Sequence, residues 1–331
     1  MEDKKSTLAF YVDDLLVRNL WETLDIEVEE HKFEILFDVY LVKNGQHEKL
    51  ITKGDLVTPA FINMLKQNHQ NTYIPLEQKE LLRDYMKEHV LDVLKGSYAT
   101  KEEKSKILYD NTTTVIKDLF DQPITPKSIG TAKEAVNSVI DTVLNGNVTL
   151  EALLNVTSYD YYTYTHSVDV AVYSIVLAKK LNLSEETIRI IGESAILHDI
   201  GKTKIPSDIV NKNGKLTVEE FEIIKHHPTY GYEILLANGE KDKNILSGVL
   251  EHHEKIDGTG YPNKLKGSQI SPIAMIISCA DIFDALTTKR SYKDPFSSYD
   301  ALSIMEKQML GGLNKKILRE FVLLMGNGLI K

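Results

Sequence analysis

An aspartate stands at the end of an apolar run, in the five-residue sequence His198-Asp199-Ile200-Gly201-Lys202. The run itself, Ile188 to Leu197, predicts a buried helix. Burying an ionised carboxylate without a partner is costly, so the fold must compensate the charge of Asp199. A divalent metal does so, because neutral imidazole and carboxylate are both good ligands for Zn, Mn or Fe. The alternative is a His198–Asp199 hydrogen bond at a helix end, which this pair considered alone would favour.

The remaining histidines favour the metal. Of the ten histidines in the chain, five more follow the same pattern as His198: His166, the pair His226-His227 and the pair His252-His253. Asp281 follows them. The other four histidines lie in the first hundred residues and are not paired. Such a concentration of ligand-type side chains in one region predicts a metal site.

Composition limits the class of protein. A chain of 331 residues is long enough for two domains, and 42% hydrophobic with 26% charged residues is typical of a soluble globular protein. The net charge of −9 argues against a partner that is polymeric nucleic acid. Cys279 is the only cysteine, which favours a reducing compartment. With no signal-peptide stretch and no window of roughly 18 apolar residues, we expect a cytoplasmic protein without a membrane span.

Residues 1–95 predict a small α/β domain. Phe33 to Val42 is rich in β-branched and aromatic residues and predicts a strand, which Asn44-Gly45 would turn into a hairpin with Lys49 to Thr52. Further elements are expected as a helix at 58–65, a strand at 73–76 and a helix at 78–94. Since this region shows no ligand cluster or glycine-rich phosphate loop, we interpret it as a regulatory or sensory domain whose signal the sequence does not name.

Residues 96–125 predict a connecting helix and linker, which Pro123 and Pro126 interrupt. From residue 126 to 331 the pattern is almost wholly helical. Helices are expected at 132–144, 149–154, 166–181, from Ser184 onward, from Thr217 through the pair His226-His227, and at 245–253, 273–286, 299–310 and 315–325. Ser184 is a predicted N-cap, and Thr217 to Glu220 a predicted capping box. Asp257 to Pro262 must be a loop, because it holds two glycines and a proline.

The order of these motifs resembles the HD superfamily of metal-dependent phosphohydrolases. A lone histidine, a His-Asp pair, a His-Pro pair, a His-His pair and an aspartate follow one another on successive predicted helices. The sequence His-His-Glu-Lys-Ile-Asp-Gly-Thr-Gly-Tyr-Pro, from His252 to Pro262, is similar to the signature of the HD-GYP subfamily. Asp281 to Leu286 and Arg290 to Lys293 match it too. The resemblance covers roughly residues 126–331 and implies an all-α HD-type helical bundle as the catalytic domain.

The reaction that this resemblance implies is hydrolysis of cyclic di-GMP, a bacterial second messenger, to pGpG or on to GMP, under regulation by the N-terminal domain. Hydrolysis of a phosphodiester needs a metal-bound hydroxide and cations that neutralise charge on the phosphate. Two metals about 3.5 to 4 Å apart supply both. Asp199 is the natural bridging ligand, because a carboxylate has two oxygens to share.

The metal ligands follow from the matched motifs. The resemblance implies that His166, His198 and Asp281 would complete the first metal site, and that His227, His252 and His253 would complete the second. His226 is expected instead to be an exposed helix residue, and the alternative for His253 is a position beside a ligand rather than on the metal. Mixed histidine and carboxylate ligands without cysteine favour Fe or Mn as the two divalent ions.

Three basic residues are implied to act on the substrate. Lys202, with Asp199 the predicted catalytic pair, resembles the family lysine that faces the scissile phosphate, where it would stabilise charge or protonate the leaving oxygen. Arg290 and Lys293 match residues that hold guanine or phosphate groups. A surface salt bridge is the alternative for Lys293.

The loop and two neighbouring positions complete the implied site. Tyr261, with Gly260 and Pro262, would shape the cleft and contact substrate or a partner. Asp284 is expected beside a ligand rather than on a metal. Tyr162 stands where some members of the family carry a glutamate for a third metal, so two metals are predicted.

Two other functions compete with this interpretation. One is a signalling adaptor that binds cyclic di-GMP or a diguanylate cyclase (GGDEF) domain without useful turnover. Retention of every expected ligand of the two metals argues against it. The other is an enzyme of the same class acting on another nucleotide or cyclic dinucleotide. The resemblance leaves formation of a homodimer open.

Overall fold

The computed structural model describes residues 10–11, 33–43, 46–58, 61, 72–78, 81–82, 101–146, 148–157, 163–289 and 294–326. The chain divides into two compact units, residues 1–111 and 112–331. The division falls within helix α4 (Lys101–Asp121), inside the segment predicted to connect the two domains. Among the helices that the structure describes, none is both long and apolar enough to cross a bilayer.

The N-terminal unit contains two small antiparallel sheets. Their strands are β1 (Phe10–Tyr11), β2 (Phe33–Glu34), β3 (Val39–Lys43), β4 (Gln46–Ile51), β5 (Leu56–Val57) and β6 (Thr72–Pro75). One sheet has the strand order β1-β6-β3-β4, and the other pairs β2 with β5. A short 3₁₀ helix, η1 (Leu76–Gln78), follows β6. The predicted turn at 44–45 lies outside the described residues, as do nearly all of the helices predicted at 58–65 and 78–94.

The single strand predicted over Phe33–Val42 is wrong, because the structure divides it into β2 and β3. Asp38 causes the interruption. Its carboxylate accepts hydrogen bonds from the backbone of Lys53 at 2.8 Å and from the ammonium of Lys49 at 2.9 Å. Its own amide donates to the side chain of Gln78 at 2.6 Å. The amide of Asp38 is thus committed to a side chain and is not available to pair with a neighbouring strand.

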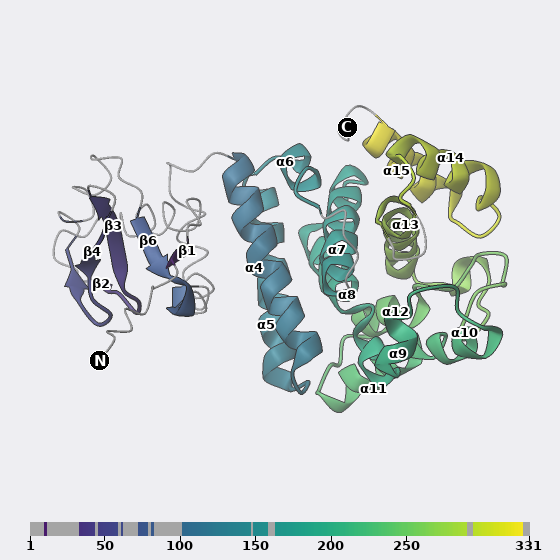
Figure 1. The fold of residues 1–331 in the computed structure, drawn as a ribbon. Helices are drawn as coiled ribbons and strands as arrows, with labels where there is room; N and C mark the ends of the chain where they lie inside the picture. The colour runs from purple at the N-terminus through teal and green to yellow at the C-terminus, as the bar shows by residue number, and fades with distance from the viewer. Residues whose placement is uncertain are drawn as a thin grey trace. The chain divides into compact units, whose positions relative to one another are not determined.

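The C-terminal unit is helical, as predicted (Figure 1). Its elements are α5 (Pro126–Leu144), α6 (Leu150–Leu154), α7 (Thr163–Lys180), α8 (Glu185–Leu197), η2 (Ile200–Lys204), α9 (Ser207–Val210), α10 (Val218–Ile224), α11 (His227–Ala237), α12 (Lys243–Glu251), η3 (Gly267–Gln269), α13 (Pro272–Thr287), α14 (Ser298–Gln308) and α15 (Lys315–Gly326). Residues 257–262 form a loop, as predicted.

Local capping sets several of these boundaries. Ser184 is the N-cap of α8, and its hydroxyl accepts a hydrogen bond from the amide of Thr187. Thr217 and Glu220 form the predicted capping box of α10. Helix α5 begins six residues earlier than predicted, because Thr125 caps it and Pro126 occupies the first turn, where no amide is needed.

One predicted helix is divided in two. The pair His226-His227 was expected on the helix that begins after Thr217, but α10 ends at Ile224 and His227 begins α11. Pro228 explains the break, since proline lacks the amide that a helix interior requires and is tolerated only in the first turn. As a consequence, His227 lies at the start of α11 and not along the face of a longer helix.

The core of this unit surrounds α7, which is buried from Thr165 to Ala178 without an exposed face. Helices α8 and α13 pack on α7, and α12 packs on α8, α11 and α13. The 3₁₀ turn η2 packs closely on α11. Gly201 permits this approach, because a methyl group at that position would overlap the carbonyl oxygen of His227. The motif that follows α8 is thereby held directly against the start of α11.

Candidate metal centre

The seven predicted ligands come together at one place in the C-terminal unit. They are His166 on α7, His198 at the C-cap of α8, Asp199 directly after it, His227 at the start of α11, His252 at the C-cap of α12, His253 directly after it, and Asp281 on α13. Six of them are buried, and the side chain of His253 is 26% exposed. Packing of five helices therefore joins residues separated by more than a hundred positions.

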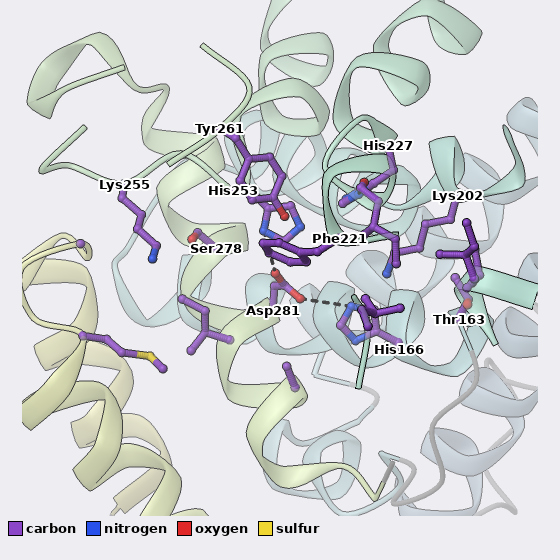
Figure 2. A pocket seen from close by; sticks show the side chains of 18 of the residues that line it. Thr163, His166, Lys202, Phe221, His227, His253, Lys255, Tyr261, Ser278 and Asp281 are labelled. Atoms are coloured by element: carbon purple, nitrogen blue, oxygen red, sulfur yellow. Dashed lines mark hydrogen bonds and ion pairs between the residues drawn. The ribbon is translucent and has the colours of Figure 1, made fainter. Parts of the chain in front are cut away.

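The ligand atoms form two groups. Atoms of His227, His252 and His253 lie within 4.8 Å of one another. A second group within the same limit contains His166, His198 and Asp199. Asp281 lies between the groups, with its Oδ1 3.2 Å from Nε2 of His166 and its Oδ2 3.7 Å from Nδ1 of His253. Figure 2 shows Asp281 between His253 and His166.

Three of the histidines have a fixed tautomer. The Nδ1 atoms of His198, His227 and His252 each lie 2.7 to 2.8 Å from a backbone carbonyl oxygen three residues earlier in the chain. A carbonyl can only accept, so Nδ1 carries the proton in each ring. The unprotonated Nε2 then offers its lone pair to the centre. Each of these histidines lies next to a helix end, and this local geometry turns its Nε2 toward the candidate metal centre.

His166 is oriented by a side chain instead. Its Nδ1 donates to Oδ2 of Asp284 at 2.6 Å, and Oδ1 of Asp284 accepts from the hydroxyl of Thr288 at 3.1 Å. This leaves Nε2 of His166 facing Asp199 at 3.5 Å and Asp281 at 3.2 Å. Asp284 is 1% exposed and therefore serves His166 from within the core.

Asp199 lies between the two groups with one oxygen facing each. Its Oδ1 is 3.2 Å from Nε2 of His227. Its Oδ2 is 3.5 Å from Nε2 of His166 and 3.4 Å from Nε2 of His198. The ammonium of Lys202 lies 2.5 Å from the same Oδ2. A carboxylate so placed is able to bridge two cations.

The charges of the centre are those that a metal site requires. Burial opposes ionisation of Asp199, yet the ammonium of Lys202 and the neighbouring His198 hold the pKa of this carboxyl well below its ordinary value. The pKa of Asp281 is likewise held low, against its burial, by His166 and His253. Both carboxylates are therefore ionised at neutral pH.

The second group of ligands is neutral. Burial lowers the pKa of His227 and of His252 well below the ordinary value. Burial also lowers the pKa of His253 to about 4, although Asp281 opposes the shift. Neutral imidazoles are the form that binds metal, so this group is ready to bind at neutral pH.

Two contacts test whether the residues fit a cation. The buried Nε2 of His198 has no hydrogen-bond partner among the described residues. The Nε2 atoms of His227 and His252 lie only 3.1 Å apart, and each bears a lone pair, because the proton of each ring is on Nδ1. Lone pairs that converge in this way fit a positive charge placed among them. Imidazole nitrogen and carboxylate oxygen, without thiolate, are a donor set for divalent transition metals.

A cavity of about 970 Å³ opens onto this centre. His166, His227, His253 and Asp281 line it, and so do Lys202 and Tyr261, which were predicted to contact substrate. Sequence reasoning missed other lining residues: Phe221 on α10, Ser278 on α13, and Lys255 and Asp257 in the loop after α12. Ser278 could have been found from the sequence, because it lies one helical turn before Asp281 and so on the same face. Loop residues carry no such periodic signal.

The glycine-rich loop, residues 254–266, packs against the candidate ligands. The ring of Tyr261 stacks on His253 with 4.7 Å between centroids and an interplanar angle of 31°. Gly260 packs so closely on the backbone of Lys255 that a side chain would overlap it. Gly260 therefore shapes the loop, whereas neither it nor Pro262 is among the residues that line the cavity. The buried carboxylate of Glu254 fixes the C-terminal part of the loop, because it accepts hydrogen bonds from the amides of Asn263 and Leu265.

The remaining predicted positions fall elsewhere. His226 is exposed and contacts Tyr230, with 5.9 Å between ring centroids, so it takes no part in the centre. Arg290 and Lys293 lie outside the described residues, and so does Tyr162. Their predicted roles stay predictions.

Comparison with known proteins shows which family residues 149–311 resemble. Residues 149–311 match the family model of the HD domain. A cyclic di-GMP phosphodiesterase of Pseudomonas aeruginosa is 37% identical over 195 residues, covering 59% of this chain and 47% of that protein. The cyclic di-GMP phosphodiesterase response regulator RpfG of Xanthomonas campestris is 44% identical over 40% of this chain and 35% of that protein. The 3′3′-cGAMP-specific phosphodiesterase 2 of Vibrio cholerae is 38% identical over 51% of this chain and 33% of that protein.

This chain thus spans about half the length, or less, of these relatives. A solved structure extends the similarity to the whole chain. An HDG"Y"P protein from Bdellovibrio bacteriovorus has a TM-score of 0.64 with 19% identity, covering 96% of this chain and 99% of that protein. At that identity the match shows a shared fold. Residues 149–311 thus match an HD domain, and the seven residues that meet at the candidate metal centre all lie within this segment.

Proposed function

We propose that this chain hydrolyses a phosphodiester bond of cyclic di-GMP to give linear pGpG. The observation that carries the proposal is the position of Asp199, whose two carboxylate oxygens face two separate groups of histidines. A centre built for a pair of cations suits phosphodiester hydrolysis, because both the attacking and the leaving oxygen need charge stabilisation. Two of the relatives are named for cyclic di-GMP, which supports this substrate.

In this proposal Asp199 is shared between two divalent cations, Fe or Mn. His166, His198 and Asp281 complete the first site, and His227, His252 and His253 complete the second. When bound, the cations supply Lewis acidity toward the phosphoryl oxygens and toward the attacking water. The structure supports this assignment through the two ligand groups and the inward Nε2 atoms of the helix-end histidines.

Lys202 is the proton donor in this proposal. Attack of water on phosphorus breaks the bond to the 3′ oxygen of one ribose, and the developing alkoxide requires a proton. Lys202 lines the cavity, and its ammonium lies 2.5 Å from Asp199. The carboxylate holds the ammonium beside the centre, where it is able to donate to the leaving 3′ oxygen. A lysine that is 16% exposed is also shielded from competing water.

The test is turnover by the metal-loaded protein. Protein supplied with Mn or Fe should convert cyclic di-GMP to pGpG, detected by chromatography, and Asp199→Ala should abolish this and lower the bound metal. Lys202→Met should retain both metal equivalents and lower kcat roughly 100-fold, as expected for loss of general acid catalysis. Full activity of Asp199→Ala would refute the catalytic assignment.

The substrate has one specific competitor. A relative that is 38% identical over half of this chain is named as specific for 3′3′-cGAMP. That cyclic dinucleotide carries the same phosphodiester linkage, so the metal centre by itself does not separate the two. Comparing kcat/KM for both substrates decides between them. Tight binding without product, measured by calorimetry, would instead favour the signalling adaptor.

The remaining parts of the proposal concern the setting of the reaction. We assign a regulatory role to the N-terminal unit and place the reaction in the cytoplasm, where a second messenger acts. Binding of a diguanylate cyclase domain and formation of a homodimer stay predictions of the resemblance. Activity of the full chain with and without residues 1–95 is the measurement for the regulatory role.

A further inference from the structure

Two charged side chains of the glycine-rich loop line the cavity at a distance from the metal ligands. Lys255 and Asp257 share that part of the wall with Gly311 and Gly312, which lie between α14 and α15. In Figure 2, Lys255 lies on the opposite side of His253 and Asp281 from Lys202. The cavity therefore has a charged region beyond the place where the reaction is proposed to occur.

The backbone holds this region in place. The amide of Ile256 donates to the carbonyl of Gly312 at 3.0 Å, and the amide of Gly258 donates to the carbonyl of Lys255 at 2.8 Å. A methyl group on Gly312 would lie 3.2 Å from Cδ of Lys255, so the alkyl stem of the lysine lies against this glycine. A packed stem restricts the positions open to the ammonium, which favours a defined contact with a ligand.

Asp257 has one committed oxygen. Its Oδ1 accepts from the amide of Thr259 at 2.8 Å and from the hydroxyl of the same residue at 2.7 Å. These bonds lower the pKa of Asp257, so the carboxylate is ionised at neutral pH. Its Oδ2 would lie 3.9 Å from a methyl group on Gly311, which places this oxygen toward the cavity corner.

Both charged groups remain available. Within the part of the chain that the structure describes, Nζ of Lys255 and Oδ2 of Asp257 form no hydrogen bond or ion pair, with each other or with another group. A lysine ammonium can only donate and an ionised carboxylate can only accept. The cavity wall thus presents a donor and an acceptor close together in sequence and fixed by the same turn.

We propose that Lys255 and Asp257 recognise a guanine base of the dinucleotide, an inference that rests on the proposed function. Guanine presents the O6 and N7 acceptors and the N2 amino donor, with the N1 donor between O6 and N2. Lys255 donates to O6, and Oδ2 of Asp257 accepts from N1 or N2. Adenine presents an amino donor where guanine has O6, so it faces the ammonium with the wrong group. The pair selects guanine over adenine.

The test uses two variants that keep the local structure. Lys255→Met retains an unbranched stem against Gly312 and removes the donor. Asp257→Asn retains an oxygen for Thr259 and exchanges the free carboxylate oxygen for an amide nitrogen. The substrates are cyclic di-GMP, 3′3′-cGAMP and cyclic di-AMP. Each variant should lower kcat/KM for cyclic di-GMP roughly 10-fold, chiefly through KM. The preference for cyclic di-GMP over cyclic di-AMP should fall by the same factor.

Lys264→Met is the matched control. Lys264 is exposed in the same loop and is not among the residues that line the cavity. Its substitution removes the same charge, and it should change neither KM nor the base preference. If Lys255→Met lowered kcat/KM equally for all three substrates, the lysine would contact phosphate or support the loop. That result would overturn recognition of guanine. An unchanged base preference in both variants would overturn it as well.

The two proposals fail in different ways. Bis(p-nitrophenyl) phosphate is a phosphodiester without a nucleobase and reports on the metal centre alone. If the Mn-loaded wild-type protein hydrolyses this ester but no cyclic dinucleotide, the proposed function is wrong, and recognition of guanine is wrong with it. If the wild-type protein hydrolyses cyclic di-GMP while both variants keep its base preference, only recognition of guanine is wrong.

Discussion

The Nε2 atoms of His227 and His252 lie 3.1 Å apart, and each ring holds its proton on the opposite nitrogen. Backbone carbonyls at the ends of two different helices fix both protons, so the rings cannot relieve the contact by exchanging tautomers. A cation between them would turn a repulsive contact into two bonds. We therefore expect a bound cation to stabilise the C-terminal unit.

The adjacent histidines His226 and His227 provide a matched pair of variants. His227→Gln should lose about one of two metal equivalents and lower kcat at least roughly 100-fold, because a ligand is removed. His226→Gln should retain metal and activity, since His226 is exposed and its ring contacts Tyr230 rather than the candidate ligands. Metal analysis of the dialysed proteins and turnover of cyclic di-GMP give the answer. Equal metal content in both variants would contradict the ligand assignment.

Asp284 should act on the metal through His166. The carboxylate accepts the Nδ1 proton of His166 at 2.6 Å. Asp284→Asn keeps an oxygen for Thr288 and turns an amide NH2 group toward Nδ1, so the bond to His166 is lost. Loss of such an orienting partner lowers metal affinity roughly 10- to 100-fold. Competition with a metal chelator measures the affinity, and thermal unfolding checks the fold. A variant with wild-type affinity at both sites would show that His166 needs no such support.

Two glycine-to-alanine variants compare a clash with the backbone and a clash with a side chain. In Gly201→Ala the new methyl overlaps the carbonyl of His227, and η2 cannot remain packed on α11. In Gly192→Ala the new methyl lies 2.8 Å from Cδ1 of Ile140, the movable end of a side chain. We expect Gly192→Ala to cost roughly 1–3 kcal/mol of unfolding free energy and Gly201→Ala to cost more.

Urea unfolding measures the unfolding free energy of the two glycine variants, and metal analysis provides a second measurement. Gly201→Ala should also bind less metal, because it displaces His227, whereas Gly192→Ala should not. If Gly201→Ala does not fold, its soluble fraction on expression should be smaller than that of Gly192→Ala. Similar stability and metal content for the two variants would contradict the close approach of η2 and α11.

Acid should destabilise the metal-free protein through the second ligand group. Burial lowers the pKa of His253 from 6.5 to about 4 and lowers the pKa of His227 and His252 in the same direction. Between pH 6.5 and about 4, His253 is protonated in the unfolded chain and neutral in the folded chain. Stability is therefore complete above about pH 6.5 and is lost as the pH falls toward 4.

The measurement is urea unfolding of chelator-treated protein between pH 7 and pH 5. Each such histidine should lower the unfolding free energy by up to roughly 1.4 kcal/mol per pH unit below its unfolded pKa. His253→Gln removes one of these groups, so its stability should depend less steeply on pH than that of the wild type. Stability that rises on acidification over this range would show that the histidines are protonated in the folded chain.

Much of the helical unit could be predicted from local signals. Ser184 and Thr217 cap helices where the sequence places caps, and the boundaries of α13 differ from the prediction by one residue at each end. One error arose where a residue acts at long range. Asp38 divides a strand by bonding to Lys53 and to Gln78, forty positions away. No periodicity within the strand signals those bonds.

The sequence alone determined the candidate ligands, their order along the chain and the resemblance to a family, because these depend only on residue types and motif spacing. Tertiary structure decided which oxygen of Asp199 faces which histidines and that Asp284 holds His166. It also placed Lys255 and Asp257 on the cavity wall. These relationships depend on the packing of helices that are distant in sequence. A side chain's neighbours across a cavity leave no periodic signal in the chain, whereas the residues that cap or continue its own helix do.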